Sequence, residues 1–216
     1  MSVECCRVGY QTPDAAQALT NALLHLLPVD RPILVACVGT DRSTGDALGP
    51  LVGSGLARRF PANVIGTVSS PLHAANMEAR LAELQLVKDA YVVAVDASLG
   101  TDDAVGTITL RQGPLLPGAG VRKSLPPIGA CHLTGVVNVG GFMEYVVLQN
   151  TRLHLVLSMA EVIVAALTQA LQQHKARRYD SAATLPAFEG AAASRSTSSS
   201  SGLSTREDRP DWISFA

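Results

Sequence analysis

The chain has 216 residues, of which 47% are hydrophobic and 16% charged, and its formal net charge is −1. A chain of this length can bury one substantial core, so one domain is the simplest expectation. The near-balance of charge excludes the strongly basic surface that is typical of nucleic-acid-binding proteins.

The first half of the chain alternates amphipathic segments with short apolar runs, which is typical of a sheet covered by helices on both faces. Thr12 and Pro13 are suited to begin a helix, and the apolar pattern continues to about Leu27. The run PILVACV, residues 32–38, is continuously apolar, as expected of a central parallel strand. After it the pattern predicts, in order, a helix over 46–59, a strand over 64–68, a helix over 75–87 and a second central strand over 91–95.

The second half begins with an alternating segment, residues 106–111, which predicts an edge strand. Residues 112–131 contain four prolines and four glycines, too many for regular structure, so they are expected to form a long surface loop. The remaining pattern predicts a helix over 135–148, a strand over 152–157 and a closing helix over 158–173.

Three divisions of the chain follow from these patterns. Residues 1–30 form an N-terminal segment with a helix, and residues 31–173 form the α/β domain. Residues 174–216 are rich in Ala, Ser and Arg, so we expect a disordered tail.

Several features favour a cytoplasmic protein that does not contact a membrane. The N-terminus lacks the apolar core of a signal peptide, and the longest apolar tract, residues 153–171, is interrupted by polar side chains and falls short of a membrane span. The spacing of the four cysteines fits neither a disulfide framework nor a metal site. One of them, Cys131, could be a reactive thiol or a bystander.

Two aspartates follow the predicted central strands. Asp46 opens the helix after residues 32–38, and Asp96 comes directly after the strand YVVAV. Because ligands of open α/β sheets bind beyond the carboxyl ends of the strands, these two carboxylates are candidates to bind a cation or to share a proton. Alternatively, Asp46 could simply cap its helix, and Asp96 could hydrogen-bond to a turn.

The glycines between Gly39 and Gly45 resemble a phosphate-binding loop, because such loops expose backbone N–H groups to an anion. The nucleotide-binding pattern requires four residues between its glycines, followed by Lys and Ser or Thr, whereas here five intervene and Asp46 follows. A carboxylate at that position repels phosphate, which disfavours nucleotide binding.

Two of the five histidines are candidates for the same site. His73 and His132 lie in irregular segments that we expect at the strand-end side, and imidazole is both a metal ligand and a proton shuttle. We favour His132, because the long loop before it could close over the site.

Several motifs resemble the YyaC-type sporulation proteins of spore-forming bacteria. The resemblance covers roughly residues 30–170 and rests on VGTDRSTGDALGP, VDASLG, VGTITLRQGPLLPGAGVRKSLPPIG, HLTGVVNVGGFMEY and LQNTRLHLVLSMAE, in that order. That family looks like a relative of the spore germination protease and, more distantly, of the hydrogenase-maturation proteases. The resemblance implies a three-layer α/β/α sandwich with a mostly parallel central sheet and a peptidase-like site.

The same resemblance implies roles for individual residues. Asp46, Asp96 and His132 correspond to the catalytic or metal-binding positions of the related proteases, so a divalent metal ion is a candidate cofactor. The predicted substrate-binding residues are Thr40, Asp41, Arg42 and His73.

These implications leave more than one function open. The leading hypothesis is an endopeptidase that acts on a protein or peptide in sporulation or germination, with the paired aspartates activating water directly or through a metal. The alternatives are a noncatalytic module that holds a peptide or metal in the same cleft, and an anion-binding protein that uses the Gly39–Gly45 loop. The oligomeric state is left open by the sequence.

Overall fold

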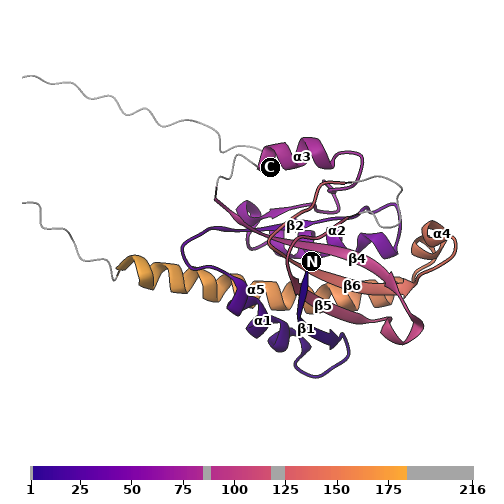
Figure 1. Ribbon diagram of the computed structural model, residues 1–216, viewed down its shortest axis with the longest axis horizontal. Helices are drawn as coiled ribbons and strands as arrows, with labels where there is room; N and C mark the ends of the chain where they lie inside the picture. The colour runs from indigo at the N-terminus through magenta and orange to yellow at the C-terminus, as the bar shows by residue number, and fades with distance from the viewer. Residues whose placement is uncertain (1, 85–88, 118–124, 184–216) are drawn as a thin grey trace, which may run out of the picture. The chain divides into compact units, whose positions relative to one another are not determined.

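Six strands form one mixed sheet in the structure, a computed structural model that describes residues 2–84, 89–117 and 125–183 (Figure 1). The strands are β1 (Val3–Gly9), β2 (Ile33–Cys37), β3 (Val64–Ile65), β4 (Tyr91–Gly100), β5 (Thr107–Gln112) and β6 (Cys131–Val139). Their order across the sheet is β1-β5-β6-β4-β2-β3. Strands β6, β4, β2 and β3 are mutually parallel, whereas β5 runs antiparallel to both of its neighbours. The expectation of an α/β fold with a mostly parallel sheet is therefore confirmed.

Helices cover the two faces of the sheet unequally. The helices are α1 (Ala15–Leu26), α2 (Leu48–Ala57), α3 (Met77–Leu84), α4 (Glu144–Gln149) and α5 (Leu153–Ala183), with short 3-10 turns η1 (Gly45–Ala47), η2 (Pro61–Asn63) and η3 (Asp102–Ala104). Helices α1, α2 and α5 pack together against one face and share its large apolar core. A smaller cluster on the other face joins Ala36, Val38 and Ala94 of the sheet to Leu72, Met77, Leu115 and Ile128.

The strongest patterns of the first half are confirmed. β2 is buried along its whole length, as its unbroken apolar run predicted, and α1 and α2 lie where helices were expected. Strand β4 is longer than predicted, because its pairing with β6 continues from Val93 to Gly100. Asp96 is therefore inside a strand, opposite Thr134, and not at its end.

The predicted helix over 135–148 is wrong in its first half. Residues 131–139 form strand β6, whose alternate residues Cys131, Leu133 and Val137 lie in the helix-covered core. Gly135 belongs to the same alternating row, and a Cβ there would lie 2.6 Å from Leu48 Cδ2 and 2.7 Å from Met159 Cε. The alternation of apolar and polar residues that marks a strand was obscured, because one of the core positions requires a glycine.

The predicted strand over 152–157 is also wrong, because α5 begins at Leu153. Its buried residues recur at helical spacing and pack against α1, α2 and the sheet; they include Val156, Met159, Ile163 and Leu167. The helix then continues to Ala183, through the first residues of the predicted tail. The remainder of that tail lies outside the described residues.

Helix α5 is long and apolar enough to cross a membrane by length and composition alone, contrary to the expectation for residues 153–171. In the fold, however, 44% of its most apolar stretch is buried. The apolar composition of α5 is therefore accounted for in large part by the core that it completes.

The N-terminal segment adds an unexpected strand. β1 pairs antiparallel with β5 from Val3 to Gly9, so β5 is not the edge strand that was predicted. Glu4 accepts hydrogen bonds from Arg7 at 2.9 Å and from Arg111 on β5 at 2.8 Å, which ties the two strands together on their exposed side. Both β1 and α1 belong to the same compact unit as the rest of the sheet.

Candidate functional site

Asp46 is held by a tight loop between β2 and α2. The backbone N–H of Thr40 donates to the Asp46 carbonyl oxygen at 3.1 Å, which closes the loop onto η1. Gly39 has a φ of 138°, and a Cβ at this position would collide with the same Asp46 carbonyl oxygen. A Cβ at Gly49 would collide with the carbonyl oxygen of Val38. The glycines therefore let the start of α2 approach the end of β2 more closely than any other residue would allow.

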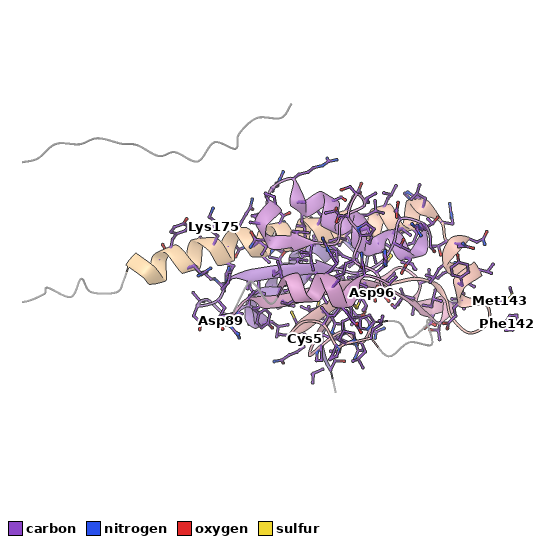
Figure 2. The ribbon with its side chains drawn as sticks, turned by 90° about the horizontal axis from the view of Figure 1, so that it is seen from above. Cys5, Asp89, Asp96, Phe142, Met143 and Lys175 are labelled. Carbon is purple, nitrogen blue, oxygen red and sulfur yellow. The ribbon has the colours of Figure 1, made fainter. Side chains whose placement is uncertain are left out.

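Asp96 approaches this loop from the neighbouring strand. β2 and β4 are paired residue by residue up to Cys37 and Val95, so Asp96 is the next residue of β4 beyond that ladder. Its carboxylate accepts a hydrogen bond of 2.9 Å from the backbone N–H of Ala97. Figure 2 labels Asp96 between the Phe142–Met143 end of the molecule and the Lys175 end.

The two aspartates interact electrostatically. Burial raises the pKa of Asp96 well above its ordinary value, and the nearby charge of Asp46 raises it further, against a small lowering by the Ala97 N–H. Burial also raises the pKa of Asp46, whereas a backbone hydrogen bond with Thr40 and the charge of His73 lower it. Asp96 is therefore the member of the pair that retains its proton, and Asp46 is the member that ionises first.

His73 lies at this site because the residue before it is hydrogen-bonded to the end of β2. Leu72 bridges to Val38, and its carbonyl oxygen accepts a hydrogen bond of 2.9 Å from the N–H of Gly39. The Nδ1 atom of His73 accepts a hydrogen bond of 3.2 Å from the N–H of Ala75. The charge of the His73 ring lowers the pKa of Asp46, which links the two side chains.

His132 occupies a different environment. It is buried on β6 opposite Ala94, and its Nδ1 atom is bonded to the Gly113 carbonyl oxygen at 2.9 Å. The alternation of the strands places it on the same face of the sheet as Asp96. The structure thus links His73, rather than His132, to the charge of Asp46.

The remaining predicted site residues line the outer part of the loop. Asp41 and Arg42 are exposed, and the Arg42 N–H donates to the Thr40 hydroxyl at 3.3 Å. The next residue, Ser43, is buried, and among the described residues its Oγ is a buried polar atom with no hydrogen-bond partner. An unpartnered buried hydroxyl calls for a bound water or ligand. The sequence analysis did not select Ser43, because nothing in its spacing distinguishes it from an ordinary loop serine.

No metal site is formed by the described side chains: none of their groups of three or more His, Cys, Asp or Glu is arranged to hold an ion. The hypothesis that Asp46, Asp96 and His132 share a metal therefore has no support in this geometry. Cys131 is buried and its pKa is raised to about 11 by burial, which does not favour a reactive thiol.

Helix α4, which contacts the turn of Asp46, carries an exposed apolar surface. Helix α4 packs on η1, and a Cβ at Gly45 would lie 2.8 Å from Leu148 Cδ2, so α4 and the Asp46 turn are in close contact. Apolar side chains on and before α4 face solvent, with Phe142 84% and Tyr145 70% exposed. The exposed group, which we call the α4 patch, consists of Val139, Phe142, Met143, Tyr145 and Val146.

Comparison with known proteins identifies the family. The family model described as "Protein of unknown function (DUF1256)" matches residues 7–166. The chain belongs to the DUF1256 family. It is also 53% identical over 143 residues to the "Uncharacterized protein YyaC" of Bacillus subtilis (strain 168), a match that covers 64% of this chain and 69% of that protein. The resemblance noted from the motifs is thereby confirmed for YyaC, and the candidate site lies within the DUF1256 match.

Proposed function

We propose that this DUF1256 protein is a hydrolase of the peptidase type that uses Asp46 and Asp96 as an acid–base pair. The observation that carries the proposal is the electrostatic coupling of two half-buried carboxyl groups whose pKa values are raised to different extents, one on β4 and one in the turn after the neighbouring strand β2. Two carboxyl groups that share one proton supply a base and an acid at the same moment. The resemblance to the germination protease supports the same chemistry.

In the proposed reaction, ionised Asp46 takes a proton from water as the water oxygen attacks the peptide carbonyl carbon. Protonated Asp96 gives its proton to the carbonyl oxygen, which yields a neutral tetrahedral intermediate. When this intermediate collapses, the C–N bond breaks, the leaving nitrogen takes the proton from Asp46, and Asp96 recovers its own. His73 acts on Asp46 as a positioning residue, because its charge favours the ionised carboxylate.

We propose a polypeptide as the substrate, and the resemblance points to a protein of sporulation or germination in the cytoplasm. The α4 patch supports this choice, since an exposed apolar surface on a helix that contacts the Asp46 turn suits an extended apolar chain better than a small polar molecule. A noncatalytic module that holds a peptide on the same patch is the second candidate, because the same features would serve binding alone.

A peptide library tests the proposal. The purified full-length protein is incubated with peptides derived from a complete bacterial proteome, and new termini are identified by mass spectrometry. We expect wild-type protein to cleave a defined subset, and Asp46→Asn and Asp96→Asn each to lower the rate by about 10²-fold or more. Asp102→Asn is the matched control, because Asp102 is exposed on η3.

Three results would decide between the candidates. Cleavage by Asp96→Asn at the wild-type rate would contradict the acid–base pair. Peptide capture without cleavage would support the noncatalytic module. Addition of EDTA separates the direct route from one through a metal, because the direct route predicts an unchanged rate.

A further inference from the structure

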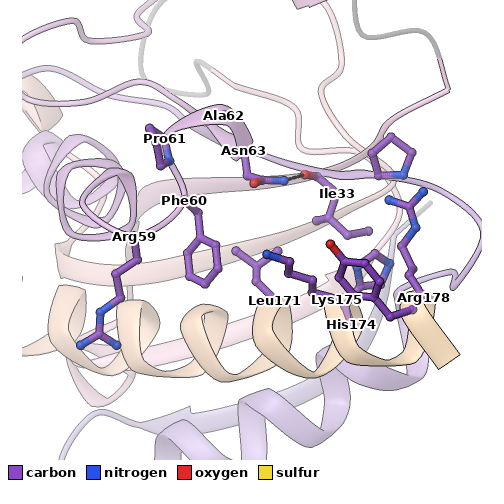
Figure 3. A pocket seen from close by; sticks show the side chains of 12 residues that line it. Ile33, Arg59, Phe60, Pro61, Ala62, Asn63, Leu171, His174, Lys175 and Arg178 are labelled. Atoms are coloured by element: carbon purple, nitrogen blue, oxygen red, sulfur yellow. Dashed lines mark hydrogen bonds between the residues drawn. The ribbon is translucent and has the colours of Figure 1, made fainter. Parts of the chain in front are cut away.

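A pocket of about 550 Å³ lies at the other end of β2 from Asp46 (Figure 3). Its walls come from the start of β2, the connection from α2 into η2, and the last turns of α5. This volume is in the range of small-molecule sites. Because β2 separates it from the carboxylates, the pocket is not a part of the candidate site described above.

Positive charge dominates the polar lining of this pocket. Arg59, Lys175 and Arg178 all line it, and no Asp or Glu is among the described residues that do so. In Figure 3, Arg59 and Arg178 lie toward opposite ends of the pocket, with Lys175 between them. Lysine and arginine heads without a carboxylate opposite them favour an anionic ligand, and guanidinium groups bind phosphate and carboxylate in a bidentate manner.

The apolar lining is aromatic and aliphatic. Phe60 points into the space between η2 and α5 in Figure 3, beside Leu171. Tyr179 also lines the pocket, and the ammonium of Lys175 lies 5.9 Å from the centre of its ring. Such walls pack well against a flat ring.

The pocket is held in shape by hydrogen bonds at its base. Asn63 donates from Nδ2 to the Ile33 carbonyl oxygen at 2.7 Å, which fixes η2 to the start of β2. His174 is buried, and its Nε2 is bonded to the Pro28 carbonyl oxygen at 2.8 Å, which fixes the adjacent turn of α5. A preformed wall lowers the entropic cost of binding.

We propose that this pocket binds a small aromatic anion, namely a flat ring that carries a phosphate or carboxylate group. The anionic group pairs with Lys175 and one of the two flanking arginines, Arg59 or Arg178, and the ring packs on Phe60. The proposal does not depend on hydrolase activity, so Asp96→Asn protein is expected to bind as wild type does.

Calorimetric titration of the full-length protein with three probes tests this site. Phenyl phosphate and benzoate represent the two anionic groups, and inorganic phosphate lacks the ring. We expect saturable binding of at least one aromatic probe, and binding of phenyl phosphate more tightly than inorganic phosphate. The triple variant Arg59→Gln/Lys175→Gln/Arg178→Gln should weaken binding at least tenfold, whereas Arg58→Gln, which changes an exposed arginine outside the pocket, should leave it unchanged.

Lack of saturable binding by every probe, or equal binding by the triple variant, would overturn the proposal. If the triple variant fails to fold, amide NMR of the wild-type protein replaces it. Addition of phenyl phosphate should then shift the resonances of Phe60, Asn63 and Leu171. Shifts confined to the Gly39–Gly45 loop would contradict the proposal and support anion binding at that loop instead.

Discussion

The two ends of strand β2 carry side chains of opposite charge in different environments. Beyond its carboxyl end, the side chains of Asp46 and Asp96 are half-buried, and this burial raises the pKa of both. At its amino end, Arg59 and Lys175 are exposed at the rim of a pocket and keep their charge in contact with water. An acid shielded from water holds its proton to a higher pH, whereas an exposed cation attracts an anion. The short strand β2 therefore separates a candidate catalytic site from a candidate binding pocket.

The largest effect on stability is expected where backbones meet at the carboxyl end. Gly49→Ala should lower the free energy of unfolding by about 3 kcal/mol, because the new Cβ collides with a backbone carbonyl that cannot move aside. Gly55→Ala is the matched control on the same helix, since its Cβ would meet only the side chain of Val164, at 2.8 Å. Denaturant unfolding of both variants measures the difference, and equal losses would refute the close packing described for the start of α2.

A smaller effect is expected from the histidine beside the acid pair. The charge of His73 lowers the pKa of Asp46, so His73→Gln should raise it and move the acidic limb of the pH–rate profile to higher pH. A charge at the edge of a site contributes on the order of 1 kcal/mol, so the rate on that limb should fall about fivefold. His154→Gln, on the exposed face of α5, should leave the limb in place. If His132→Gln moved the acidic limb and His73→Gln did not, the role of positioning Asp46 would belong to His132 and the prediction would be wrong.

The same acid pair makes stability depend on pH. Because the folded-state pKa of Asp96 is raised, its burial does not oppose folding below the unfolded pKa of 3.8, and the cost in free energy of unfolding grows as pH rises toward the folded-state value. Asp96→Asn mimics the protonated acid, so it should raise the melting temperature at pH 7 and have little effect near pH 4. Thermal unfolding across this range checks the sign, with Asp102→Asn as the exposed control. A stabilisation that does not vary with pH would contradict the raised pKa.

The sequence predicted the proximity of Asp46 and Asp96 better than it predicted which histidine interacts with them. The apolar run before Gly39 and the motif around Asp46 were enough to predict that the two carboxylates lie close together, because parallel strands bring their carboxyl ends to one edge. The sequence analysis named both His73 and His132 but favoured His132, since the contact between Leu72 and the end of β2 is a long-range pairing that leaves no local pattern. Strand β6 was missed for a related reason. A glycine is required at position 135 because Leu48 and Met159 leave no room for a side chain, and this requirement cannot be read from the neighbouring residues in the sequence.

The basic pocket had no sequence signal at all. Phe60 and Leu171 are more than a hundred residues apart and meet only when α5 packs beside α2. Lys175 and Arg178 also fall in the part of the chain for which composition predicted disorder, whereas α5 continues through it. The prediction of disorder from composition was therefore wrong for the last turns of α5. These turns continue a helix that is anchored by the core residues before them.

The central claim is that Asp96 retains its proton where an ordinary aspartate has lost it. Carbon-13 NMR of protein labelled at aspartate carboxyl carbons, with Asp46→Asn and Asp96→Asn for assignment, reports each protonation state directly across a pH titration. The account predicts that Asp46 titrates first and that Asp96 remains protonated well above its ordinary pKa of 3.8. Titration of Asp96 near 3.8 would contradict it.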